Sequence, residues 1–207
     1  MGWYLVNSSR ANLNNFICGK AQNGNGRMQF EECNGALGFW MGGGYNGKTS
    51  EVFTVANCMP VGEWAHVALT KSGGTVRIYV NGELVGESNL FTMGLCNANL
   101  HVGGFDAGGS RGGFIGAFRN VGFWSRVMGP IKIKNHMHAL PDTGDEKLLG
   151  YWPLDEGGGN AVRNLKDGSS AAVPVGNGFF MWNKGANMPM IDGPLPLVDS
   201  GTKIIFR

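Results

Sequence analysis

Residues 63–82 read EWAHVALTKSGGTVRIYVNG, and this stretch carries the strongest structural signal in the chain. Between residues 75 and 80, Val and Ile alternate with Thr, Arg and Tyr. This period of two residues predicts a strand with one face on a core and the other in water. Ser72-Gly73-Gly74 and Asn81-Gly82 suit hairpin turns, because Gly and Asn accept positive φ. The stretch therefore predicts three consecutive antiparallel strands, at residues 63–70, 76–80 and 83–86.

The same stretch resembles the W-x-H-V-A-x-T…Y-V-N-G signature of laminin-G-like domains, which are concanavalin A-like jelly rolls. LHVGG at residues 100–104 and GGFIGAFRNVGFWSRVM at residues 112–128 resemble the late strands of that family. LLGYWPLDEGGGN at residues 148–160 resembles a segment that flanks such domains. The resemblance covers residues 14–182 and implies an all-β fold, an antiparallel β-sandwich jelly roll. Most domains of this kind bind ligands, and a minority of the wider fold cleave glycans.

Composition limits the classes of function. The chain has 207 residues, of which 43% are hydrophobic, enough for one sizeable core. Its formal net charge is +2 and it has no Lys/Arg run, so we expect no nucleic-acid partner. No apolar run approaches the length of about 18 residues that a membrane span needs. We expect one laminin-G-like jelly-roll domain over residues 1–184 and an extended, proline-interrupted C-terminal arm over residues 185–207.

Turn signals predict the remaining elements. Further strands are expected at residues 14–20, 28–33, 36–41, 51–56, 98–103, 113–124 and 202–206. One short helix is predicted at residues 130–138, because Pro130 suits a first helical position and Pro141 prevents continuation. If every turn reverses the chain, one end of the sandwich carries loops 21–27, 42–50, 71–74 and 88–97. The opposite end then carries the two Asn-Gly turns and loops 57–62 and 104–112.

The first of these ends has most of the long loops and is the predicted ligand site. Aromatic rings stack on sugars, and amide side chains both donate and accept hydrogen bonds. Trp40 also suits a core position, and loop asparagines also suit turns. We expect glycans, neighbouring protein subunits, or both as partners. The predicted ligand-binding residues are Asn23, Asn25, Trp40, Tyr45, Asn46, Phe91 and Asn97.

Sequence context argues against an enzyme. GGGYNGKT at residues 42–49 matches a phosphate loop, but β-rich sequence follows where a helix is required. GGSRG at residues 108–112 matches a nucleophile elbow, but a strand is expected to follow. The paired carboxylates of glycan-cleaving relatives have no counterpart, since Asp142, Asp145 and Glu146 fall in a loop. We therefore predict no catalytic residue, and keep a glycoside-active enzyme of the same fold as an alternative.

No cofactor is predicted, although the resemblance makes calcium a candidate. The available oxygen ligands are Asp106, Asp155, Glu156 and Asp167, and they have no EF-hand spacing. His66 alternates with Trp64 on a predicted strand, which favours a hydrogen-bonded core histidine over a catalyst.

The cysteines and the N-terminus bear on location. Cysteines at 18, 33, 58 and 96 show no C-x-x-C spacing, so we expect no zinc site. The N-terminal sequence does not have the form of a signal peptide, so the thiols are expected to stay mostly reduced. We predict a non-catalytic module on a virion or extracellular surface, decorating a larger assembly. A secreted calcium-dependent carbohydrate-binding or adhesion module is the alternative.

Overall fold

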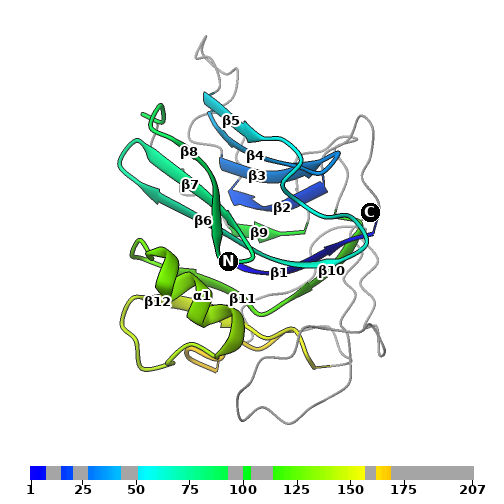
Figure 1. Cartoon of the computed structure of the whole chain (residues 1–207). Helices are drawn as coiled ribbons and strands as arrows, with labels where there is room; N and C mark the ends of the chain where they lie inside the picture. The colour runs from blue at the N-terminus through cyan, green and yellow to red at the C-terminus, as the bar shows by residue number, and fades with distance from the viewer. Residues whose placement is uncertain are drawn as a thin grey trace.

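The computed structural model shows two large antiparallel sheets packed face to face, with a smaller third layer beside them (Figure 1). It describes residues 1–7, 15–20, 28–42, 51–92, 100–103, 114–156 and 162–168. The elements are β1 (Gly2–Val6), β2 (Asn15–Lys20), β3 (Met28–Cys33), β4 (Ala36–Met41), β5 (Glu51–Val55), β6 (Trp64–Ser72), β7 (Thr75–Val80), β8 (Glu83–Ser88), β9 (Leu100–Val102), β10 (Gly116–Arg119), β11 (Val121–Trp124), α1 (Pro130–His138) and β12 (Leu148–Trp152).

Three sheets are formed by these strands. The first sheet has the order β10-β1-β6-β7-β8, the second has the order β5-β4-β3-β2-β9, and β11 pairs with β12. Every strand pair is antiparallel. The all-β jelly-roll class and the helix at residues 130–138 are therefore confirmed. Among the described residues, no helix is long and apolar enough to cross a membrane.

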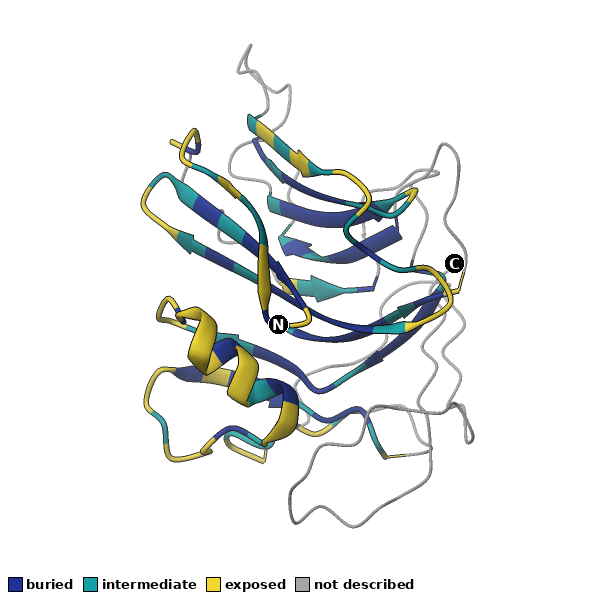
Figure 2. Ribbon diagram, in the orientation of Figure 1, coloured by how far each residue is buried: buried dark blue, intermediate teal, exposed yellow. Residues whose placement is uncertain are grey.

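One apolar core lies between the two large sheets. Alternate residues of facing strands point into it, so the inner strands are buried (Figure 2). Each fully buried side chain of this size stabilises the fold by roughly 1.5–3 kcal/mol. Core side chains with no exposed surface include Val6, Leu37, Phe39, Met41, Val76, Ile78, Phe114 and Phe118.

The two Asn-Gly turns have the predicted backbone. Asn34 and Gly35 have φ of 51° and 75°, and Asn81 and Gly82 have φ of 49° and 79°. Positive φ at both central residues defines a type I′ turn, whose twist matches that of the flanking strands. The Asn81 Oδ1 atom also accepts a hydrogen bond from the His66 backbone N–H at 2.9 Å. The turn after β7 is therefore also tied to the backbone of β6.

The strand ends confirm the predicted grouping of loops as far as the described residues reach. At one end, the Phe91 N–H donates to the Gly74 carbonyl at 3.1 Å. At the same end, the Thr92 N–H donates to the Glu51 carboxylate at 3.0 Å. At the other end, the Cys58 N–H donates to the Gly35 carbonyl at 2.9 Å.

The structure contains two strands that were not predicted, and it divides one predicted strand into two. β1 lies at the centre of the first sheet, between β10 and β6, although no strand was predicted before residue 14. β12 was also missed as a strand. The predicted strand 113–124 is broken at Asn120, where φ is 54° and the chain passes from β10 to β11. A short apolar run such as residues 3–6 lacks the alternation that identifies a half-buried strand.

The third layer covers the outer face of the first sheet. α1 turns its buried residues Ile133 and Met137 toward the protein. Ile133 packs with Ala68, Tyr79 and Met128 in a second apolar cluster, separate from the main core. One face of the first sheet therefore lies against the core, and α1 packs on the other face at Ala68 and Tyr79 (Figure 1).

A buried polar link joins the second sheet to the segment that leads into β10. Glu32 has no exposed surface although it is acidic. Its carboxylate accepts hydrogen bonds from Asn15 Nδ2 at 2.6 Å and from the Gly35 N–H at 2.8 Å. The Asn15 Oδ1 atom accepts from the Ile115 N–H at 3.1 Å. The link thus ties the Asn34-Gly35 turn, β2 and the approach to β10 together.

Candidate functional site

Trp40 lies on the outer face of the second sheet. In β4, Leu37, Phe39 and Met41 point into the core, and the alternation of a strand places Gly38 and Trp40 on the opposite face. Trp40 pairs with Gln29 of β3 on one side and with Val52 of β5 on the other. The predicted ligand residue is therefore neither in the core nor in a loop.

Only part of this outer face is accessible. On β3, Gln29 and Glu31 are buried. On the edge strand β5, Val52 is 43% exposed and Thr54 is also exposed (Figure 2). Trp40 is partly exposed between these two strands. We call four residues the Trp40 strip: the partly exposed Trp40, the exposed Val52 and Thr54, and the buried Gly38 beside them.

Trp40 differs from the other described tryptophans in its indole nitrogen. In Trp3, Trp64, Trp124 and Trp152 this nitrogen is buried and has no hydrogen-bond partner. The Trp40 nitrogen does not belong to that buried set, and no described residue accepts its N–H. Within the part of the chain that the structure describes, the Trp40 N–H therefore has no acceptor.

Gly38 sets how the Trp40 ring lies. A Cβ atom on Gly38 would stand 3.1 Å from Trp40 Nε1 and 3.6 Å from Thr54 Oγ1. The nitrogen-bearing edge of the indole thus rests against the glycine, and the Thr54 hydroxyl faces the same small space. A donor nitrogen and a hydroxyl are held side by side, next to the apolar surface of Val52.

The other predicted ligand residues have different outcomes. Phe91 as a ligand residue is wrong: it is 1% exposed and belongs to the core. Its ring packs edge-on against Phe39, with centroids 5.0 Å apart. Its place in a loop gave no sign of this, because an aromatic side chain in a loop can turn inward to gain burial. The predicted residues Asn23, Asn25, Tyr45, Asn46 and Asn97 lie outside the described residues.

Sequence reasoning missed Gly38, Val52 and Thr54 as members of the site. The signal that could have found them is the alternation within residues 36–41 and 51–55. Once Phe39 is assigned to the core, Gly38 and Trp40 must share the other face. Which residues of β5 stand beside them depends on the strand register.

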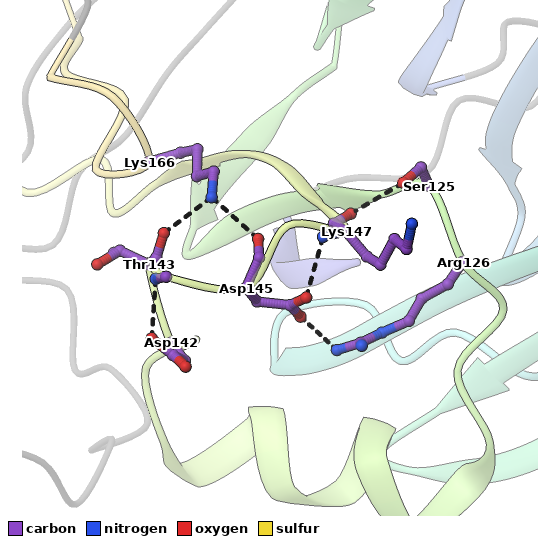
Figure 3. Close-up of polar contacts among 8 residues, drawn as sticks. Ser125, Arg126, Asp142, Thr143, Asp145, Lys147 and Lys166 are labelled. Carbon is purple, nitrogen blue, oxygen red and sulfur yellow. Dashed lines mark hydrogen bonds and ion pairs between the residues drawn. The ribbon is translucent and has the colours of Figure 1, made fainter.

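A second polar cluster lies in the third layer, between the loop after α1 and the segment 162–168 (Figure 3). Lys166 Nζ donates to the carbonyl oxygens of Thr143 and Asp145, both at 2.9 Å. The Asp145 carboxylate accepts from the Lys147 N–H at 3.0 Å and pairs with Arg126. Asp142 Oδ1 accepts from the Gly144 N–H at 2.8 Å.

These bonds give the acidic residues a structural role. The carboxylates stabilise the turns of the loop, and Lys166 holds the loop to the following segment. Glu146 is exposed. The expectation that residues 142–146 form a polar turn rather than a catalytic pair agrees with this geometry.

No group of three metal-ligating side chains is found in the part of the chain that the structure describes. Of the calcium candidates, Glu156 accepts a hydrogen bond from the Arg163 N–H at 2.8 Å. Asp106 lies outside the described residues.

His66 is a core residue, as predicted. It is 1% exposed and packs edge-on against Trp3, with ring centroids 5.5 Å apart. Burial, as the largest cause, lowers the pKa of His66 to about 3. Its Nδ1 atom has no hydrogen-bond partner. A buried neutral imidazole of this kind packs like an aromatic ring.

The chain matches a family model over residues 3–134, that of the concanavalin A-like lectin/glucanases superfamily. The chain belongs to this family. The match includes every strand of both large sheets, apart from Gly2 of β1, and the first half of α1. The Trp40 strip therefore lies within the part of the chain that the family defines.

Of two similar solved structures, the first shares the fold. A proposed carbohydrate binding protein from Bacteroides ovatus ATCC 8483 has 24% sequence identity and a TM-score of 0.63. The similarity covers 81% of this chain and 48% of that one, so the chain spans about half the length of this relative. Domains LG4-5 of the mouse laminin alpha1 chain have 21% identity and a TM-score of 0.47, covering 58% of this chain and 33% of that one. No curated protein sequence matches the chain.

Proposed function

We propose that this protein is a non-catalytic carbohydrate-binding module and that the Trp40 strip is its contact surface. The observation that carries the proposal is the partly exposed indole of Trp40, whose N–H no described residue accepts, on a strand face beside the exposed Thr54. Aromatic rings offer stacking surfaces to sugar C–H groups, and nearby hydroxyls and N–H groups bind sugar oxygens. The lectin-like fold supports this class of ligand.

The distribution of carboxylates supports binding without catalysis. Glycoside cleavage needs two carboxyl groups about 5–9.5 Å apart across the scissile bond. Around the Trp40 strip, Glu31 is the one carboxylate that the described outer face offers, and it is buried. Residues Asp142 and Asp145 are engaged in turns of the third layer.

The site of action follows from the ligand. We propose that the module works at an extracellular or virion surface, where glycans are displayed. Decoration of a larger assembly stays a prediction. The arm that would carry subunit contacts, residues 185–207, lies outside the described residues.

Binding to an array of neutral and acidic oligosaccharides tests the proposal, with the wild type compared with Trp40→Ala. Removing an aromatic stacking platform should lower affinity roughly 10-fold or more. Ile131→Ala is the matched control, because Ile131 is 75% exposed on α1 and away from the second sheet. The proposal fails if no glycan binds, or if Trp40→Ala binds as the wild type does.

A further inference from the structure

We infer that Gly38, Trp40 and Thr54 form a subsite for two neighbouring hydroxyl groups of a neutral sugar, and that Gly38 is its positioning residue. This inference rests on the proposed function and specifies the ligand class. It is built on three observations: the contact of Gly38 with the indole edge, the placement of two polar atoms over one space, and the charges of the surrounding face.

Gly38 determines the orientation of the indole. A side chain at this position would meet Trp40 Nε1 at 3.1 Å, closer than ordinary van der Waals contact. Gly38 has no positive φ, so its backbone alone does not require glycine. The steric reason for glycine here is the ring above it. Without that close approach, the N–H edge of Trp40 would turn away from Thr54.

The indole N–H and the Thr54 hydroxyl form a pair with complementary abilities. The indole only donates, while a hydroxyl both donates and accepts. Both atoms lie within 4 Å of one point above Gly38. Two adjacent hydroxyls on a pyranose ring can meet such a pair, one accepting from the indole and the other exchanging a hydrogen bond with Thr54. The exposed side chain of Val52 lies beside them and suits the apolar C–H face of the ring.

The charge of the face favours a neutral sugar. Carboxylate recognition usually employs Arg or Lys, which form charge-assisted hydrogen bonds. Among the described residues that point outward from the second sheet, none is Lys or Arg. The row across the sheet reads Val52, Trp40, Gln29, Gly19 and His101 in register.

Nuclear magnetic resonance of the indole N–H groups tests the inference on the whole chain. The signal lost in Trp40→Phe identifies Trp40. This signal should exchange with water faster than those of Trp3, Trp64, Trp124 and Trp152. The probes are methyl β-D-glucopyranoside, methyl β-D-galactopyranoside and methyl α-D-mannopyranoside, with methyl β-D-glucuronide as the charged partner of the first. We expect at least one neutral glycoside to shift the Trp40 signal, and the glucuronide to bind more weakly than glucopyranoside.

Three variants separate the parts of the subsite. Trp40→Phe keeps the stacking ring and removes the N–H, and Thr54→Val keeps the shape and removes the hydroxyl. Each should weaken binding about 3- to 10-fold, the effect of one hydrogen bond between neutral groups. Gly38→Ala should weaken binding by at least as much and should move the Trp40 indole signal before any sugar is added. Gly129→Ala is the control, since nothing lies within 4 Å of its added Cβ and its φ is −77°.

The outcomes distinguish this inference from the proposed function. If Trp40→Ala abolishes binding but Gly38→Ala and Thr54→Val bind normally, the module binds glycans and the subsite is wrong. Tighter binding of the glucuronide also overturns the inference. If no probe shifts the Trp40 signal while the array shows binding elsewhere, both the strip and the subsite are refuted. Equal melting temperatures of the variants and the wild type show that lost binding reflects the site.

Discussion

Replacing Glu32 by alanine should destabilise the sandwich more than any surface acidic substitution. Glu32 is fully buried, and its carboxylate holds Asn15 Nδ2 and the Gly35 N–H. Asn15 in turn accepts the hydrogen bond of the Ile115 N–H, at the approach to β10. The substitution removes both acceptor oxygens and leaves a gap that alanine cannot fill with a polar atom.

The size of the effect follows from the two donors that lose their acceptor. A buried donor left unsatisfied costs about 1–3 kcal/mol, and bonds to charged acceptors lie in the upper part of that range. Asn15 is fully buried, while the Gly35 N–H is partly accessible and can regain water. We therefore expect a loss of about 3–4 kcal/mol in the free energy of unfolding. For a chain of this size, that corresponds to a melting temperature about 10 °C lower.

Urea unfolding monitored by tryptophan fluorescence measures this loss. The free energy of unfolding of Glu32→Gln should lie between those of the wild type and Glu32→Ala. The glutamine amide offers one acceptor oxygen, but its NH₂ group faces one of the two donors that the carboxylate had accepted from. Glu83→Ala is the control: its side chain is 73% exposed in an ion pair with Lys134, worth about 0–1 kcal/mol. A loss below about 1 kcal/mol for Glu32→Ala would refute the structural role of the link, since two buried hydrogen bonds cannot be worth so little.

Three further predictions concern a turn, a histidine and a close approach. Asn81→Ala should lower the free energy of unfolding by about 2 kcal/mol, because alanine tolerates the φ of 49° poorly and offers no acceptor for the His66 N–H. Urea unfolding measures this loss, and an unchanged midpoint would contradict the prediction. The pKa of His66 is lowered to about 3, so between pH 3 and 6.5 the unfolded state binds more protons at this residue. The contribution of His66 to the free energy of unfolding therefore falls as pH decreases from 6.5 to 3, with a slope of up to about 1.4 kcal/mol per pH unit. Because His66→Phe removes this titration, a plot of its melting temperature against pH should be flatter than that of the wild type. Gly116→Ala should prevent folding or expression, because its Cβ would stand 1.8 Å from the Leu5 carbonyl oxygen. The control Gly129→Ala should leave the melting temperature unchanged. If both variants melt like the wild type, the β1–β10 contact is not as close as the structure shows.

The strands with clear alternation or tight turns could be predicted from the sequence. β3 and β4 have the predicted bounds, and the Asn34-Gly35 turn fixes where β3 ends and where β4 begins. α1 also has the predicted bounds, because Pro130 suits the first turn. β1 could not be found in this way, since a central strand reads as a short apolar run, and its place between β6 and β10 depends on residues more than 50 positions away.

The candidate site was predicted only in part. Trp40 was included because aromatic side chains suit sugars, and its accessible indole supports that choice. Phe91 was included for the same reason, yet it is a core residue. Residue type does not say on which side of the sheet a ring lies. That depends on which neighbouring strand offers burial, and Phe39 offers it to Phe91.

The local physics of the chain determined its turns, its short helix and the period of its strands, because positive φ, proline geometry and side-chain alternation act between residues near one another. The tertiary structure alone decided that Val52 and Thr54 stand beside Trp40. It also decided that the indole edge of Trp40 lies close to Gly38, and that Glu32 is buried with its partners. These relations join strands through register, and a shift of one residue would exchange the two faces of the sheet. The sequence determines which residues of a strand share a face. The packing of two sheets around one core determines which face is buried and which residues of different strands come into contact.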